Sequence, residues 1–314
     1  MPKDFTHADY VPHFTGHETF HMRYGWLKKA FDKIKEAGDK ASTQVFSDGD
    51  AIARFGVGKN MVASIRYWAV GCDVLEGKNG SICFTPFGDK LFSNQGLDPF
   101  LENASSLWLL HWKLATNIER TSYYWTFNYF NEANFSKKSL SNKLIQFAEK
   151  SGWKMPALNT IEKDFAVLLS TYSAGTRHKR GSAEDSLTSP LAELGLIRSG
   201  IKIDDYHLGW GPKPSLSDGA FLFALLDFWN QHSTSNTLNF QTILLEPGSP
   251  GRVFLMDEND LAVRLMNLDA LTGGKLAWSE TAGMRQIVRN KAIDETEKWQ
   301  ILAKDFGRTI TKAA

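Results

Sequence analysis

The stretch of sequence that decides the fold covers residues 47–92 and reads SDGDAIARFGVGKNMVASIRYWAVGCDVLEGKNGSICFTPFGDKLF. Its first part predicts a short helix over residues 51–55, which the turn Gly56-Val57-Gly58 separates from a second helix over residues 59–70. Two short segments then flank a tight turn at residues 77–80, and this pattern is typical of a β-hairpin. A helix, a turn, a second helix and a hairpin in this order predict a winged helix-turn-helix.

The second helix is the predicted recognition element for double-stranded DNA. Helical spacing places Lys59 and Arg66 opposite the apolar stripe of this helix. No acidic residue occurs from residue 51 to residue 72, so no carboxylate there repels a phosphate. Arginine, lysine and asparagine side chains also pair with base edges in the major groove. The predicted DNA contacts of the N-terminal region are Arg23, Arg54, Lys59, Asn60, Ser64, Arg66, Tyr67 and Lys78. In the alternative, the same topology serves protein contacts and this face is only solvated.

An unusual string, GHETF, lies upstream at residues 16–20. We expect a helix from about Thr15 to Gly38, in which His17, Glu18 and His21 lie within one turn. These side chain types suit a divalent metal or general acid–base catalysis. In the alternative, Thr15 and Glu18 form a capping box that satisfies the first backbone N–H groups.

The whole chain divides into four predicted segments. Residues 1–95 hold the N-terminal helix and the winged helix-turn-helix, and residues 96–173 form a helical region rich in aromatic residues. Residues 174–186 contain no apolar side chain larger than alanine, which predicts an exposed loop. The cations Arg177, Lys179 and Arg180 make this loop a second candidate DNA contact. Residues 187–314 form a C-terminal module, in which residues 238–290 suggest a second winged-helix unit.

The C-terminal module contributes three candidate motifs. The string EPGSPGR at residues 246–252 has glycines that let a backbone approach a phosphate and an arginine that could bind it. Its alternative is a rigid turn. Lys213 and Arg285 lie in predicted loops and are candidate phosphate contacts. The EPGSPGR string lacks the spacing and the lysine of a phosphate-binding loop, so neither a nucleotide nor an organic cofactor is expected.

Composition restricts the class of protein. The 36 lysines and arginines nearly balance the 35 aspartates and glutamates, so an affinity for DNA must come from local clusters. The 42% hydrophobic and 23% charged shares are ordinary for a globular protein. We expect a mainly α protein with small β-wings. The two cysteines, the polar N-terminus and the lack of a long apolar run predict a cytoplasmic protein with no membrane partner.

Several blocks taken in order carry a family resemblance. They are FTGHETFHMRYGWLKK, GVGKNMVASIRYWAVGCDVL, TPFGDKLF, DPFLENASSLWLLHW, EDSLTSPLAELGLI, GPKPSLSD, EPGSPGRVF and ETAGMRQIVR, and they run from Phe14 to Arg289. Together they resemble the domain of unknown function 4007 family, which includes the SspB-type proteins of bacterial DNA phosphorothioation systems.

The resemblance implies a subunit that nicks one DNA strand so that sulfur can be inserted for phage defence. It implies partners of three kinds: a cysteine desulfurase, an ATPase and a phosphoadenosine-phosphosulfate-reductase-like protein. A nickase must stabilise negative charge at phosphorus, which a carboxylate-held Mg²⁺ or Mn²⁺ ion, or arginines, can do. Within the blocks the catalytic candidates are His17, Glu18, Asp185, Glu246 and Arg252, and the candidate metal ligands are Glu18 and Glu246.

Two other functions stay open at this point. A non-catalytic adaptor would bind DNA and deliver the sulfur-inserting enzymes, and the lack of a recognisable nuclease motif favours it. A transcriptional regulator would bind one palindromic site as a two-fold dimer.

Overall fold

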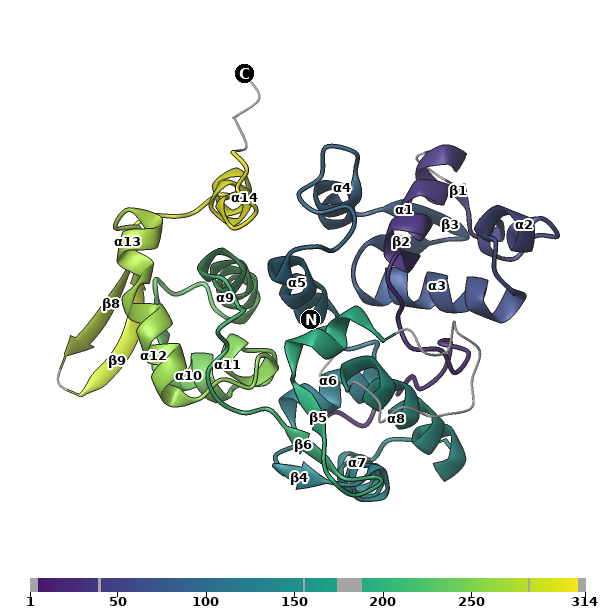
Figure 1. Cartoon of the computed structure of the whole chain (residues 1–314). Coiled ribbons are helices and arrows are strands. Elements are labelled where there is room, and N and C mark those ends of the chain that lie inside the picture. The colour runs from purple at the N-terminus through teal and green to yellow at the C-terminus, as the bar shows by residue number, and fades with distance from the viewer. Residues whose placement is uncertain (1–4, 39–40, 155, 174–187, 282, 310–314) are drawn as a thin grey trace.

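The computed structural model describes residues 5–38, 41–154, 156–173, 188–281 and 283–309. Helices dominate these residues, and the strands form three small antiparallel sheets of three strands each (Figure 1). The predicted mainly α class with small β-sheets is therefore confirmed. Within the described residues, no helix combines the length and the apolar character that a membrane crossing requires.

The N-terminal unit runs from α1 to β3. It comprises α1 (Trp26–Ala37), β1 (Ala41–Ser42), the 3₁₀ helix η1 (Thr43–Phe46), α2 (Ala51–Phe55), α3 (Lys59–Gly71), β2 (Leu75–Lys78) and β3 (Ser81–Phe84). The turn between α2 and α3 opens with Gly56, whose φ of 63° lies in the left-handed region that glycine adopts at no steric cost. The sheet order is β1-β3-β2, with β2 and β3 as the predicted hairpin. A short helix, α4 (Pro86–Phe92), follows.

The segment before α1 differs from its predicted structure. The expected helix from Thr15 is wrong, because the first helix begins at Trp26. Glu18 and Thr19 have φ angles of 48° and 66°, which a right-handed helix does not allow. The capping box at Glu18 is therefore wrong as well. The residues of this segment form a loop instead.

The middle unit begins after α5 (Ala104–Ala115), which lies near the centre of the molecule (Figure 1). It comprises α6 (Thr121–Asn128), β4 (Asn134–Phe135), α7 (Lys137–Ser151), α8 (Leu158–Tyr172), the 3₁₀ helix η3 (Pro190–Leu194), β5 (Ile197–Ser199) and β6 (Tyr206–Leu208). Its sheet order is β4-β6-β5. The sequence suggests a boundary at residues 174–186, whereas this sheet joins strands from both sides of that segment.

The C-terminal unit has the elements that the sequence suggests for a second winged helix, in shorter pieces. It comprises α9 (Asp218–His232), β7 (Thr237–Asn239), α10 (Phe240–Leu245), α11 (Pro250–Val253), α12 (Glu258–Met266), α13 (Leu268–Thr272), β8 (Leu276–Thr281) and β9 (Met284–Arg289). The sheet order is β7-β9-β8. A last helix, α14 (Glu295–Lys304), packs on α9 (Figure 1).

All three sheets share one topology. In each, the third strand lies between the first and the second, and at least two helices separate the first strand from the second. The sequence does not predict the middle sheet, because its strands are only two or three residues long, too short for an alternation pattern to show.

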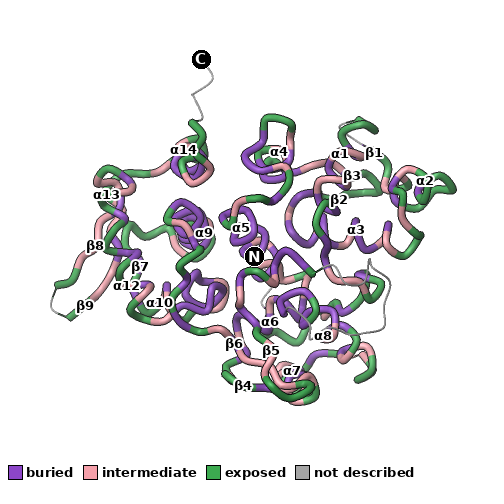
Figure 2. Tube along the Cα trace, in the orientation of Figure 1, coloured by how far each residue is buried: buried purple, intermediate pink, exposed green. Residues whose placement is uncertain are grey.

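One continuous apolar core joins the three units. It includes the fully buried Trp68, Trp108 and Trp229, and Figure 2 shows α5 and α9 buried over most of their length. The aromatic residues thus serve mainly to fill the core. Truncating one of these indoles to alanine would cost about 3–5 kcal/mol of stability.

A chain of charges also ties the units together. The Lys113 ammonium lies 3.1 Å from Asp73, between α3 and β2, and 3.3 Å from Asp227 on α9. The other oxygen of Asp227 lies 2.9 Å from Lys298 on α14. Burial lowers the pKa of Lys113, but the two carboxylates outweigh it and hold the pKa above its usual value. The lysine therefore stays charged and bridges the N-terminal unit and α9.

Candidate functional site

The exposed face of α3 carries the cations that the sequence predicts. Lys59, Asn60 and Arg66 are all exposed. Within the described part of the chain, no ion pair engages Lys59 or Arg66. Both charges are therefore available to an external anion. Lys78 is exposed as well, at the end of β2 beside the hairpin turn.

Four other predicted contacts of this region are less accessible. Ser64 is fully buried and its hydroxyl faces the Phe20 carbonyl. Arg23 is also buried, with its guanidinium 5.6 and 5.3 Å from the ring centroids of Phe20 and Trp26. Arg54 is held by Asp48 and by the Val45 carbonyl. Helical spacing alone could not show these tertiary contacts.

Tyr67 is the fourth, and it belongs to a packed cluster. Its ring lies 4.2 Å from the Arg120 guanidinium, which also donates to the Tyr67 carbonyl over 3.2 Å. Burial raises the pKa of Tyr67, so its phenol stays neutral. Arg120 sits at the start of α6, and no local motif in the sequence connects it with α3.

The loop of residues 16–20 runs along α3. A Cβ on Gly16 would lie 2.9 Å from the Tyr67 ring, and the His17 ring meets the same ring edge to face at 5.6 Å between centroids. Further along, the Trp68 indole N–H donates to the Phe20 carbonyl over 3.1 Å. The structure therefore brings two separately predicted features together, the GHETF string and the recognition helix.

His17 anchors this loop to α8. The ring is buried, and its Nε2 lies 2.8 Å from Oδ1 of Asp164 on α8. The backbone N–H of Thr19 donates to Nδ1 over 3.0 Å, so Nε2 must carry the proton that is shared with the carboxylate. The hydroxyl of Ser122 donates to the other oxygen of Asp164. Burial raises the pKa of Asp164, against the effect of its partners. Both nitrogens of His17 are occupied, which leaves neither for a metal.

Glu18 projects from the same loop. It is exposed, and among the described residues no hydrogen bond or ion pair holds its carboxylate. Glu18 and Thr19 both have left-handed backbone angles, which cost about 1–3 kcal/mol each in residues other than glycine. Strain of this kind concentrates at functional sites. The loop thus presents a free carboxylate next to α3.

The candidates of the C-terminal module lie elsewhere. Helix α11, which carries Arg252, and helix α3 are on opposite sides of α5 (Figure 1). Glu246 is exposed at the end of α10, which lies with α11 on the side of α5 away from α3 (Figure 1), so the structure does not bring it together with Glu18. Within the described residues, no group of three histidine, cysteine, aspartate or glutamate side chains is placed to hold a metal.

Arg252 is an internal clamp. Its guanidinium donates to the carbonyls of Asn128 and Phe130 over 3.0 and 3.1 Å, and to the Asn131 side chain over 2.7 Å. Burial lowers its pKa to about 10. These bonds join α11 to the end of α6, so the structure gives Arg252 a structural role.

Lys213 and Arg285 are engaged as well. The Lys213 ammonium donates to the carbonyls of Gly209 and Gly211, each over 2.7 Å, and burial lowers its pKa to about 8. Arg285 pairs with Glu258 over 2.5 Å. Asp185, Arg177, Lys179 and Arg180 lie outside the described residues.

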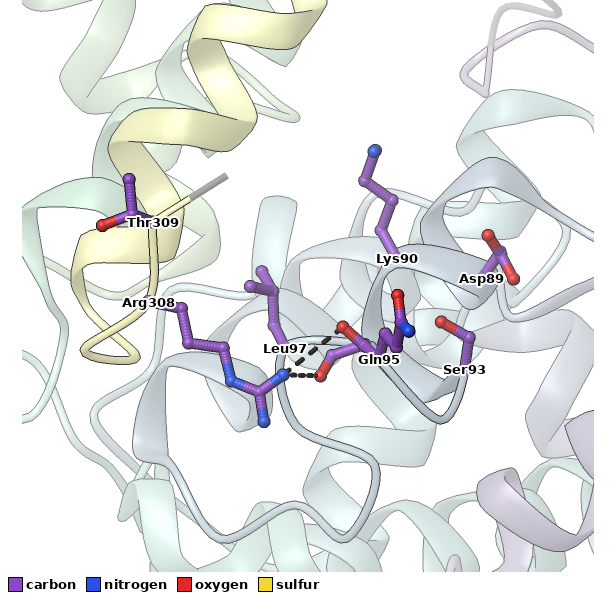
Figure 3. Close-up of a pocket in the computed structure, with 8 residues that line it drawn as sticks. Asp89, Lys90, Ser93, Gln95, Leu97, Arg308 and Thr309 are labelled. Atoms are coloured by element: carbon purple, nitrogen blue, oxygen red, sulfur yellow. Dashed lines mark hydrogen bonds between the residues drawn. The ribbon is translucent and has the colours of Figure 1, made fainter. Parts of the chain in front are cut away.

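A hollow of about 450 Å³ lies between the end of α4 and the residues after α14 (Figure 3). Asp89 and Lys90 line one side and Arg308 the other. The Arg308 guanidinium donates to the carbonyls of Gln95 and Gly96, which fastens the end of the chain to the loop after α4. The hollow therefore lies where the residues after α14 are fastened to the loop after α4, and we assign it a structural role.

Comparisons with known proteins agree with the resemblance seen in the sequence. A crystal structure of SspB superposes with a TM-score of 0.81 at 27% identity, over 96% of this chain and 90% of that one. A crystal structure of magnesium-bound SspB gives a TM-score of 0.80 at 27% identity, over 95% and 89% of the two chains. No curated protein matches the chain by sequence. The profile of a protein family of unknown function, DUF4007, matches residues 14–306, and the chain therefore belongs to the DUF4007 family.

Proposed function

We propose that this protein binds double-stranded DNA through a winged helix-turn-helix formed by the N-terminal unit, and that it nicks one strand. The observation that carries the proposal is the free cationic face of α3 with the strained Glu18 loop beside it. In this arrangement α3 enters the major groove, where Lys59, Asn60 and Arg66 meet base edges and phosphates. Lys78 in the hairpin contacts the adjacent backbone.

The chemistry of nicking needs two things that this surface supplies in part. Water must attack the phosphorus, and the negative charge that builds up on the phosphate oxygens must be stabilised. We assign the first role to the Glu18 carboxylate, as a base or as the ligand of a divalent ion, and the second to Lys59 and Arg66. Mg²⁺ is commonly held by one or two carboxylates together with phosphate oxygens, so a single protein carboxylate fits this ion. Such an ion, when bound, would add further charge stabilisation.

The likeness to SspB supports a place in a DNA phosphorothioation system. In this proposal the protein opens one strand for the sulfur-inserting enzymes, and its partners are the ATPase and the reductase-like subunit of that system. In this proposal, nicking and sulfur insertion both take place on chromosomal DNA in the cytoplasm.

The decisive experiment combines gel retardation with a plasmid assay. Wild-type protein should retard a duplex and convert supercoiled plasmid to open circles with Mg²⁺ or Mn²⁺, and EDTA should abolish the conversion. The double variant Lys59→Glu/Arg66→Glu should bind much more weakly, with a smaller dependence of log K on log salt because two cation contacts are lost. The matched control is Lys291→Glu/Lys304→Glu, which makes the same change in net charge at exposed positions of the C-terminal region.

The outcomes separate the candidate functions. Retardation without nicking, in a sample that contains either metal, would favour the adaptor, which the lack of a three-ligand metal group in the described residues also favours. Equal affinity of the folded double variant and wild type would refute the assignment of α3. Binding confined to one palindrome would favour a transcriptional regulator.

A further inference from the structure

The hairpin of β5 and β6 exposes two isoleucines at its tip. Ile201 and Ile203 have exposed fractions of 104% and 100%, and the next most exposed large apolar side chain of the described residues, Phe100, reaches 68%. Leaving an isoleucine in water forgoes about 1.5–3 kcal/mol of burial free energy. Neither side chain therefore serves the stability of the isolated fold, and both are available to a ligand.

The tip is held in one conformation. The backbone N–H of Gly200 donates to the Asp205 carbonyl over 2.7 Å and closes the turn. A Cβ at Gly200 would lie 2.2 Å from the Asp205 carboxylate, so a larger residue there would displace that side chain. The two isoleucines are thus presented on a closed turn at the end of a two-stranded ribbon.

The position of this hairpin in the topology points to its ligand. In the N-terminal unit, the equivalent hairpin is β2–β3, which ends in the polar Lys78 and Asn79 and is the wing of the proposed DNA-binding module. The β5–β6 hairpin consists of the second and third strands of the middle sheet, and β2–β3 consists of the second and third strands of the N-terminal sheet. It differs in that its tip is apolar.

The charges around the tip favour an anionic ligand, as DNA is. Lys202 lies between the two isoleucines and is exposed, as is Arg198. Two carboxylates, Asp204 and Asp205, lie on the same turn. Asp204 accepts the backbone N–H of Lys137 over 3.2 Å, which places the start of α7, with Lys137 and the exposed Lys138, beside the tip. The four cations therefore outnumber the two carboxylates there.

We propose that the β5–β6 hairpin is a wedge, which inserts Ile201 and Ile203 between neighbouring base pairs of a DNA duplex from the minor groove. This inference rests on the proposed DNA binding and adds a distortion of the duplex to it. Proteins that kink DNA use isoleucine, leucine or methionine wedges, and they offset the unstacking cost of a few kcal/mol per step with the extra contacts that a bent duplex permits. A kink would also separate the stacked pairs near the strand that is to be opened.

The test is permanganate footprinting, because permanganate oxidises thymines only where they are unstacked. A thymine-rich duplex is saturated with wild-type protein, with Ile201→Ala/Ile203→Ala, with Lys202→Ala, or with the control Val263→Ala/Met266→Ala. The control residues are apolar and exposed on α12, a different unit. All substituted side chains are exposed, so the variants should fold, and circular dichroism checks that they do.

We expect wild-type protein and the α12 control to raise thymine reactivity several-fold at a localised step, and the isoleucine variant to lose this signal. Lys202→Ala should keep the signal but lower the salt dependence of binding. Bound wild-type protein without enhanced reactivity, or an unchanged signal in the isoleucine variant, would overturn the wedge and leave DNA binding intact. Absence of any binding by wild-type protein would overturn the proposed function and the wedge together.

Discussion

The His17–Asp164 contact gives the sharpest test of how the candidate site is built. Replacing His17 by alanine removes the ring that shares its proton with Asp164 and accepts the Thr19 N–H. Asp164 then remains fully buried with Ser122 as its remaining side-chain partner in the described structure. Leaving a buried group without its hydrogen-bond partner costs about 1–3 kcal/mol, and more when that group is a carboxylate. We therefore expect His17→Ala to lower the free energy of unfolding by about 3 kcal/mol or more.

The matched variant is Asp164→Asn. An asparagine oxygen can still accept the Nε2 proton of His17, and a neutral amide costs less to bury than a carboxylate. We expect a loss of about 1 kcal/mol, the value of an ordinary hydrogen bond. Urea denaturation, followed by tryptophan fluorescence, measures both variants at equal protein concentration.

The functional readout distinguishes an anchor from a catalytic residue. His17 positions the loop that presents Glu18, so His17→Ala should reduce nicking per folded molecule, while DNA affinity should change little because Lys59 and Arg66 are untouched. Asp164→Asn should retain most of the nicking activity. If His17→Ala were as stable as wild type but inactive, the anchor role would be refuted and direct catalysis by the imidazole favoured.

Two further predictions concern the buried cations. Arg252→Ala leaves the Asn128 and Phe130 carbonyls without their hydrogen-bond donor, at about 1–3 kcal/mol for each unsatisfied group. Denaturant unfolding should therefore show a large loss of stability. A stable variant that binds DNA but does not nick it would instead support the catalytic prediction for this arginine. Lys213 has a folded-state pKa of about 8, below its usual 10.5, so the unfolded chain binds more protons between these values and this group makes stability rise with pH across that interval. Stability curves of wild type and Lys213→Met between pH 7 and pH 10.5 should therefore diverge as the pH rises, and parallel curves would contradict the burial of this ammonium group.

The sequence predicts the N-terminal unit well because its signals are local. The turn at residues 56–58, the apolar stripe of α3 and the hairpin turn near Asn79 each lie within a few residues of the element they specify. The structure has α3 at residues 59–71, against a predicted 59–70. Local patterns of this kind are the ones that a single sequence can reveal.

The candidate site depends on contacts that no local pattern encodes. His17 meets Asp164 across 147 residues, and Arg252 meets Asn131 across 121 residues. The GHETF string looked like a helix start because serine, threonine and glutamate spacing is shared by caps and by other tight loops. The contacts of this loop with Tyr67 and Asp164, which lie far along the chain, are absent from any local pattern. The burial of Lys213 likewise depends on tertiary packing, so the sequence does not distinguish this lysine from one on the surface.

The three units show that topology and function separate in this protein. The longest helix between the first strand and the hairpin is α3 in the N-terminal unit and α12 in the C-terminal unit. Helix α3 exposes Lys59 and Arg66, whereas α12 begins with acidic residues, buries its arginine, Arg264, and exposes Val263 and Met266. A duplex would be repelled by the first turn of α12 and attracted by the first turn of α3, although the strands behind both helices are connected alike. The assignment of DNA binding to the N-terminal unit therefore rests on side chains, and a change of charge on α3 alone is enough to test it.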